Sequence, residues 1–185
     1  NNGSLINGPT FNSGNGGSIV FDGTNDFSSF PGNTFGYSPG TTGEISLEMW
    51  IYPTAATWTS GVFYLIDHGP QANQGTLHYT SNNLVYYSYY NGSNVPPYTS
   101  GVVFPGLYSM SGGTIPANTW THVALCRQNL VTNMFINGQI IKSGPDPYNY
   151  GSLSGAPFVN PIVSPATQSI SIGARIDGAY LFKGN

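Results

Sequence analysis

The sequence contains little charge and a single cysteine, and it has no long hydrophobic run. Only 6% of its 185 residues are charged, against about 25% in a typical globular protein. Four lysine and arginine residues neutralise too few phosphates for nucleic-acid binding, and no run is apolar enough for membrane insertion. Cys126 is the one cysteine, so an internal disulfide is excluded.

The low charge does not indicate disorder, because 39% of the residues are hydrophobic and 14% are aromatic. Solubility must therefore come from uncharged residues such as Asn, Ser, Thr, Gly and Tyr. A surface rich in hydroxyl and amide groups suits glycan binding or ordered self-association, and it is common in extracellular and virion proteins. We expect an extracellular or virion-surface protein whose partners are a glycan or cell-surface ligand, or other structural subunits.

The sequence also lacks the apolar period of an α-helix. No stretch of useful length repeats apolar side chains every 3.6 residues, whereas 25 glycines and 14 prolines interrupt the chain at short intervals. This pattern is typical of an all-β sandwich, and the length suits one domain. Outside the region described next, strands are predicted at 18–21, 45–52, 62–67, 76–80, 84–90, 169–176 and 179–182.

Residues 118–144 contain the clearest β pattern. Trp120 and His122 begin a run in which alternate side chains fall on opposite faces of a strand. Further on, Asn137-Gly138 separates two short apolar runs. A type I′ turn needs positive φ at both central residues, which Asn and Gly tolerate. We predict a tight hairpin at this dipeptide, preceded by the strand that contains Trp120.

Two long segments, 91–118 and 144–167, contain many prolines and no clear strand pattern. Loops of this length are uncommon in a compact domain and are often functional. The alternative is that each segment contains short edge strands, for which 102–104 is a candidate.

Four motifs occur in one order along the chain and together resemble the laminin-G-like, concanavalin A-like jelly-roll domains. They are GSIVFDGTNDF at 17–27, SLEMWIYP at 46–53, WTHVA with FINGQ at 120–124 and 135–139, and SIGA at 171–174. The resemblance implies an antiparallel jelly-roll β-sandwich that forms a single domain over residues 1–185. It also implies a non-enzymatic role in binding or adhesion.

The chain departs from the family pattern at its C-terminal end. Members usually continue past the position of Gly184 into a closing strand, but this sequence stops at Asn185. We expect a sandwich without its own closing strand and infer that the chain is part of a longer polypeptide. Alternatively, a neighbouring subunit supplies the strand to an open sheet edge.

Asp22, Asn25 and Asp26 form an oxygen-rich turn. Calcium takes six to eight oxygen ligands from carboxylates, amides and carbonyls, and many domains of the family hold calcium at a rim of the sandwich. Calcium is therefore the candidate cofactor. The alternative is that these side chains cap main-chain amides of the turn.

A cluster of tyrosines and amides is the candidate carbohydrate site. It consists of Tyr86, Tyr90, Asn91, Asn94 and Tyr98. Sugars bind flat aromatic faces that are flanked by amide and hydroxyl groups. The alternative is that the tyrosines pack in the core or on an ordinary strand surface.

No catalytic residue is predicted. Glu44, Ser46 and Glu48 share one strand face, as in related glycosidases, but the central acid of that pattern is a serine here. We predict a binding or adhesion domain that recognises a glycan or a cell surface. The alternative is a structural subunit of a fibre, filament or capsid that assembles through sheet edges, and a more distant one is a glycoside hydrolase.

Overall fold

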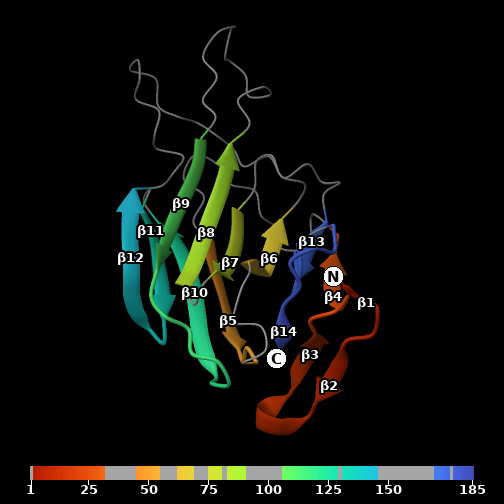
Figure 1. The fold of residues 1–185 in the computed structure, drawn as a ribbon. Helices are drawn as coiled ribbons and strands as arrows, with labels where there is room; N and C mark the ends of the chain where they lie inside the picture. Colours follow the sequence, from red (N-terminus) through yellow and green to blue (C-terminus); the bar gives the residue numbers. More distant parts are fainter. Residues whose placement is uncertain are drawn as a thin grey trace, which may run out of the picture.

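The computed structural model of this chain describes residues 2–31, 45–54, 62–68, 75–80, 83–90, 106–128, 131–145, 169–175 and 177–185. In this part of the chain every strand pair is antiparallel, and the one helical segment is the 3-10 turn η1, Gly14–Gly16 (Figure 1). None of these residues belongs to a helix with the length and apolar character needed to cross a membrane. The all-β prediction is confirmed.

One layer of the sandwich is a seven-stranded sheet. Its strands, in spatial order, are β1 (Ser4–Ile6), β4 (Phe27–Phe30), β13 (Ile170–Ile172), β6 (Val62–His68), β7 (Gly75–Thr80), β8 (Asn83–Tyr90) and β9 (Gly106–Gly112). The strand β6 lies in the middle of the sheet, as its continuous apolar run predicts. The predicted meander of β7 and β8 is also confirmed.

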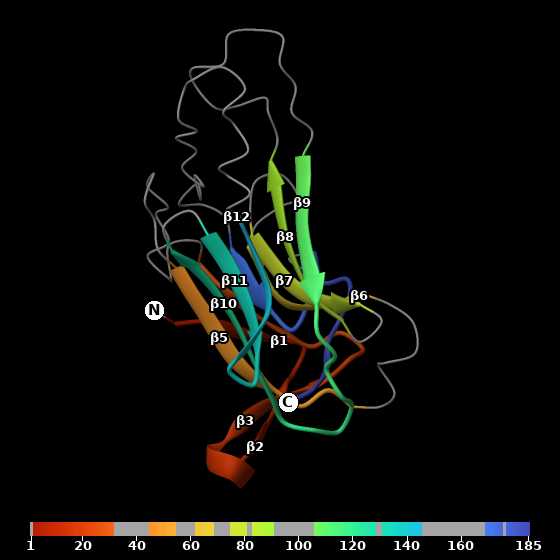
Figure 2. The same ribbon diagram turned by 90° about the vertical axis from the view of Figure 1, so that its left-hand side faces the viewer.

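The opposite layer combines two smaller sheets. The first contains, in order, β12 (Gln139–Pro145), β11 (Val131–Ile136), β10 (Thr121–Gln128) and β5 (Ile45–Ile51). The second contains β14 (Lys183–Gly184), β3 (Ser18–Asp22) and β2 (Thr10–Asn12). Figure 2 shows the first of these sheets facing the strands β7, β8 and β9.

The strand β14 joins the two smaller sheets. On one side it pairs with β3. On the other side, the Thr54 amide donates to the Lys183 carbonyl over 3.1 Å, and Tyr52 and Asn185 exchange two main-chain hydrogen bonds of 2.7 and 3.1 Å. The segment Lys183–Asn185 is therefore paired on both sides, and the missing closing strand predicted beyond Asn185 stays a prediction.

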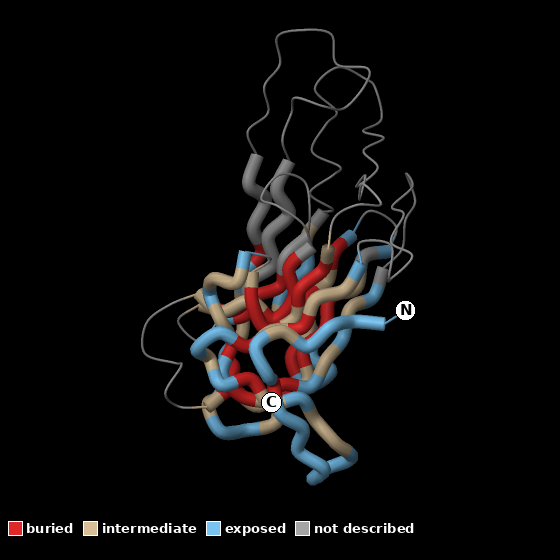
Figure 3. Tube along the Cα trace, turned by 90° about the vertical axis from the view of Figure 1, so that its right-hand side faces the viewer, coloured by how far each residue is buried: buried red, intermediate tan, exposed pale blue. Residues whose placement is uncertain are grey.

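Alternation along β5 and β10 directs apolar side chains into the space between the layers. Ile51, Val123 and Leu125 are buried, whereas Trp50, at the intervening position on β5, is 62% exposed. Burying each such aliphatic side chain stabilises the fold by about 1.5–3 kcal/mol. Figure 3 shows the buried residues in the interior of the molecule and the exposed ones at its periphery.

The hairpin predicted at Asn137-Gly138 connects β11 and β12. Both residues have positive φ, at 48° and 77°, as a type I′ turn requires. In addition, the Asn137 side-chain oxygen accepts a hydrogen bond of 2.9 Å from the His122 amide on β10. The turn therefore fixes the position of β10 as well as the register of the hairpin.

One segment predicted as an irregular loop contains a full strand. Within 91–118, β9 pairs with β8 at seven successive positions. Its sequence GLYSMSG has glycine at both ends and serine at alternate central positions, so its own β propensity is low. The strand forms because β8 offers it an edge, and the suggested strand at 102–104 lies outside the described residues.

The strands predicted near the C-terminus differ from those observed. β13 ends at Ile172, earlier than predicted, because Gly173 has a φ of 87°. Arg175 Nε then donates to Asp177 Oδ1 over 2.9 Å and closes a turn. The strand predicted at 179–182 is consequently absent from the described structure, and this part of the chain leads into β14.

Three short strands near the N-terminus, β1, β2 and β4, have no clear signal in the sequence. Each contains only three or four residues, which is too short for an alternation pattern to be read. They form because antiparallel partners satisfy their main-chain groups.

Substitutions at Asn137 test how the turn stabilises the sandwich. Asn137→Gly keeps the positive φ and loses the bond to His122, so we expect about 1 kcal/mol less stability. Asn137→Ala also places an alanine in the left-handed region and should lose about 2 kcal/mol in total. Urea denaturation measures the free energy of unfolding of both variants. An equal loss in the two would contradict the expectation that alanine is strained at the φ of 48° found at residue 137.

Candidate functional site

A row of aromatic side chains lies on the outer face of β5 and β10. Trp50 and His122 are direct cross-strand partners, and their ring centroids lie 5.2 Å apart. The next pair along the strands is Tyr52 and Trp120, with ring centroids 5.5 Å apart. We call these four residues the aromatic row. It forms because the register of β5 against β10 places two alternating pairs side by side.

Trp50 is the most accessible member of the aromatic row. Its exposed fraction is 62%, which is unusual for the largest apolar side chain in a soluble protein. An indole ring held by a neighbouring imidazole offers a flat face to a ligand, because the contact limits the rotation of both rings.

A cavity of about 490 Å³ adjoins the aromatic row and lies between the two layers. Its walls come from both sheets and are mainly apolar, including Phe21, Phe30, Met49, Ile51, Leu65 and Phe182. The cavity lies between β3 and β5, and its lining includes Asn185, the last residue of the given sequence.

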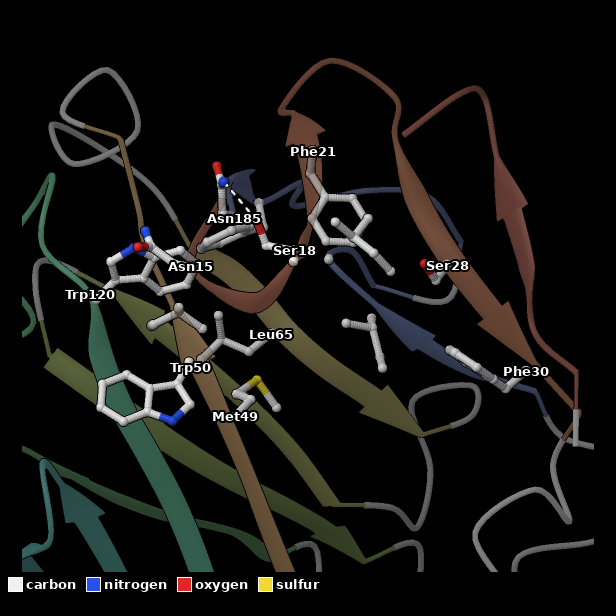
Figure 4. Close-up of a pocket in the computed structure, with 16 residues that line it drawn as sticks. Asn15, Ser18, Phe21, Ser28, Phe30, Met49, Trp50, Leu65, Trp120 and Asn185 are labelled. Carbon is white, nitrogen blue, oxygen red and sulfur yellow. Dashed lines mark hydrogen bonds between the residues drawn. The ribbon is translucent and has the colours of Figure 1, made fainter. Parts of the chain in front are cut away.

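The two ends of the cavity differ in chemistry, as Figure 4 shows. Trp50, Trp120 and Asn15 lie toward one end, and Ser28 and Phe30 lie toward the other. Ser18 and Asn185 add further polar groups, and Asn185 Nδ2 donates to Ser18 Oγ over 3.0 Å. We call Asn15, Ser18 and Asn185 the amide rim.

None of the described side chains that line the cavity carries a formal charge. Its hydrogen-bonding groups are the side-chain amides and hydroxyls of the amide rim and the hydroxyl of Ser28. Such a surface favours an uncharged ligand with hydroxyl groups, because there is no ionic partner for a charged one.

The predicted calcium turn has a different geometry. Asp22 Oδ1 accepts hydrogen bonds from the amides of Thr24 (2.7 Å) and Asn25 (3.4 Å). Asp26, which is 5% exposed, accepts the Asp22 amide at Oδ2 over 3.1 Å. The bond from Thr24 holds the pKa of Asp22 below its ordinary value of 3.8.

These contacts agree with the capping alternative, in which carboxylates satisfy the amides of their own turn. Among the described residues, no group of three or more His, Cys, Asp or Glu is arranged to hold a metal ion. Calcium binding by Asp22, Asn25 and Asp26 stays a prediction.

The predicted tyrosine site lies largely outside the described residues. Tyr86 and Tyr90 belong to β8, which pairs with β7 and β9. Their side chains, and all of Asn91, Asn94 and Tyr98, are not described. Carbohydrate binding at these five positions stays a prediction.

The acidic residues considered for catalysis do not form a site in the described structure. Glu48 is on the outer face of β5, is 75% exposed at its side chain and lies 3.5 Å from His122. Ser46 is on the same face beside Cys126, with the two side chains 3.5 Å apart, and Glu44 lies outside the described residues.

His78 is a buried histidine on β7. It is fully buried, and its ring stacks on Tyr64 with centroids 5.0 Å apart. Burial lowers the pKa of His78 to about 4, so the ring is neutral at neutral pH. It contributes to packing and is not part of the cavity.

The candidate site was not predicted from the sequence. Trp50 and Tyr52 alternate along one strand, and Trp120 and His122 along another, but the motifs that contain them were interpreted as markers of the fold. The alternation was a usable signal, because two aromatic pairs of this kind form one surface if their strands are neighbours. Asn15 and the other amides of the rim carry no comparable signal.

The architecture is that of an antiparallel jelly-roll sandwich with an aromatic row beside a cavity. Residues 21–185 match the laminin G-type profile of the concanavalin A-like lectin/glucanases superfamily. The chain belongs to this superfamily, and the predicted family and fold are confirmed. A comparison with curated protein sequences finds no match.

Several solved structures are similar in fold. The receptor-binding domain of botulinum neurotoxin C/D mosaic serotype has a TM-score of 0.65 and 14% identity, covering 93% of this chain and 38% of that chain. The ligand-binding domain of serotype D, in complex with N-acetylneuraminic acid, has a TM-score of 0.64 and 13% identity, covering 93% and 37%.

A third similar structure is the binding domain of botulinum neurotoxin DC in complex with rat synaptotagmin II. Its TM-score is 0.63 and its identity is 13%, covering 92% of this chain and 38% of that chain. The present chain therefore spans less than two fifths of the length of these structures. At such identity, the likeness shows the fold alone.

Chelation tests whether the Asp22–Asp26 turn needs calcium. We expect the melting temperature to be the same in calcium and in EDTA, because main-chain amides already satisfy the carboxylates. Asp22→Asn should lower the melting temperature equally in both conditions. A rise with calcium that Asp22→Asn abolishes would contradict this expectation and establish a metal site.

Proposed function

We propose that this domain is a non-enzymatic binding module that recognises an uncharged glycan on a cell surface or another extracellular surface. The observation that carries the proposal is the aromatic row, in which the 62% exposed Trp50 lies against His122 on the outer face of β5 and β10. An extracellular or virion-surface location is part of the same proposal.

The physical chemistry of sugars supports this choice of ligand. One face of a pyranose ring presents C–H groups, which pack against an aromatic face such as that of Trp50. The hydroxyl groups at the ring edge need hydrogen-bond donors and acceptors, and Asn side chains offer both. Asn15 supplies such a group on the same side as Trp50 and Trp120.

A binding role is favoured over hydrolysis by what lines the cavity. Retaining glycosidases place two carboxyl groups about 5–5.5 Å apart across the sugar. The described lining residues include no carboxylate, and Glu48 lies on the outer face of β5 beside His122. The cavity and the aromatic row therefore provide contact surface and hydrogen bonds, without an acid and base pair.

The similar structures support the class of ligand without identifying it. One is a complex with a sugar, N-acetylneuraminic acid, and another is a complex with the protein synaptotagmin II. The uncharged cavity of the present chain favours a neutral glycan.

Binding to a glycan array tests the proposal and distinguishes the two candidate sites. We expect Trp50→Ala to reduce binding of any positive glycan at least tenfold, because it removes the exposed stacking surface. Ile140→Ala is the matched control, since Ile140 is 60% exposed on β12 of the same layer. Loss of binding in Tyr90→Ala, with Trp50→Ala unchanged, would move the site to the predicted tyrosine cluster.

A second function, as a structural subunit of a fibre, filament or capsid, is favoured by the hairpin of β2 and β3. Phe11 on the edge strand β2 is 72% exposed, and its register partner Ile19 is 39% exposed. Residues 1–21 contain no charged side chain. Natural edge strands usually carry charges that prevent pairing with another chain, so this edge suits self-association.

Light scattering over a range of concentrations tests this second function. We expect the unmodified protein to form assemblies. We expect Phe11→Lys to disrupt them, because the lysine charge would be buried at the paired edge of β2. The control is Ile140→Lys, which places the same charge on β12 at the other end of the layer. A monomer at every concentration would contradict assembly through β2.

A further inference from the structure

We propose that the Glu48 carboxylate, beside the aromatic row, accepts hydrogen bonds from two adjacent hydroxyl groups of the sugar that packs on Trp50. The ligand class is then a neutral glycan with a free vicinal diol, and acidic glycans are excluded. This inference rests on the proposed function, because the sugar on Trp50 is the ligand of the same site. It adds to that function a residue that determines specificity and the hydroxyl pattern that this residue recognises.

Glu48 and Trp50 lie on the same face of one strand. They are two residues apart on β5, where alternate side chains point to the same side of the sheet, so their Cα atoms are about 7 Å apart. The Glu48 side chain is 75% exposed, and Trp50 is 62% exposed. A sugar that packs flat on the indole therefore brings the hydroxyl groups of its edge within reach of the Glu48 carboxylate.

The Glu48 carboxylate is directed toward β10 by His122. Its register partner on β10 is Ala124, which has no polar side-chain group. The carboxylate contacts the diagonal neighbour instead, with Oε2 of Glu48 3.5 Å from Nε2 of His122. The same imidazole packs on Trp50, with ring centroids 5.2 Å apart. His122 thus brings the carboxylate and the indole ring to one place on the outer face.

Most of the hydrogen-bonding capacity of Glu48 is unused by the described residues. A carboxylate has two oxygens with about four lone-pair sites, and the contact with His122 is the one polar contact of this side chain in the described structure. Two hydroxyl groups on neighbouring sugar carbons present two donors side by side, which match the two carboxylate oxygens. Hydrogen bonds to a charged acceptor are stronger than those between neutral groups.

The sign of the charge on Glu48 defines which glycans are excluded. The chain contains only seven acidic residues, and this one lies next to the exposed indole of Trp50. An acidic sugar on Trp50 would bring a second carboxylate beside Glu48, and like charges placed together at an interface weaken binding. A neutral sugar meets no such repulsion. Glu48 therefore favours the neutral class for a reason that does not involve the cavity.

The contact between Glu48 and His122 lies on the β10 side of β5. Asn185 pairs with Tyr52 at the other edge of that strand. A strand that continued in this register would lie beside β5 in the same layer, since paired strands are about 4.8 Å apart. It would border the outer face without covering it. The carboxylate, the imidazole and the indole would keep their arrangement.

Two matched pairs of hexasaccharides test the diol and the charge by calorimetry. Cellohexaose has free hydroxyl groups at C2 and C3 of every residue, whereas chitohexaose has an acetamido group at each C2. Methyl-esterified hexagalacturonate is neutral, whereas the free acid carries a carboxylate on every residue. We expect the first member of each pair to bind about fivefold more tightly or better at low ionic strength, where repulsion between charges is least screened.

Glu48→Gln separates a role in recognition from a role in folding. It keeps the size of the side chain but removes the charge, so we expect about tenfold weaker binding of the neutral hexasaccharides and tighter binding of free hexagalacturonate. A folding defect would weaken both. The control combines Glu48→Gln with Ile140→Glu, which restores the net charge at the far end of the same cross-strand row. It should bind as Glu48→Gln alone does.

The outcomes distinguish this inference from the proposed function. Loss of binding in Trp50→Ala, with no change in Glu48→Gln, would overturn the inference and leave glycan binding intact. Equal affinities within each pair, or a positive array glycan without a vicinal diol, would overturn it too. Tighter binding of a glucosamine hexasaccharide than of cellohexaose would show that the carboxylate binds an ammonium group instead. Absence of glycan binding, both on the array and by calorimetry, would contradict the proposed function and the inference together.

Discussion

The layer opposite the seven-stranded sheet depends on one constraint. The C-terminal segment pairs with main chain on both of its sides. Lys183–Asn185 bonds to β3 on one side and to residues 52–54 on the other. Without it, the N-terminal hairpin would have no main-chain link to β5. The segment thus holds the two sheets together, and the cavity adjoins it between β3 and β5.

The candidate site thus follows from how the layer is assembled. Trp50 and Trp120 come from two strands of one sheet, and the amide rim comes from η1, β3 and the C-terminal residue. Phe182 packs edge-on against Phe21 with ring centroids 6.2 Å apart, so the segment that closes the layer also forms part of the cavity wall. Residues that close the layer therefore also line the candidate site.

Membership of the superfamily establishes the sandwich but does not by itself define a ligand, because one fold supports many functions. The proposed ligand class depends on the site, and above all on its lack of charge. This property extends to the whole chain, of which 6% is charged. A domain with so little electrostatic steering must select its ligand through shape, stacking and neutral hydrogen bonds.

The sequence by itself determined the all-β class, the alternation of β5 and β10, the Asn137-Gly138 turn and the family. These features depend on neighbouring residues, so a local pattern is sufficient to read them. Only the tertiary structure decided that β9 is a strand, that Asn185 is paired, and that Trp50 meets Trp120 and Asn15 at one cavity. Those outcomes depend on contacts between segments that are distant in the sequence. Strand register and layer packing create these contacts, and no local sequence pattern predicts them.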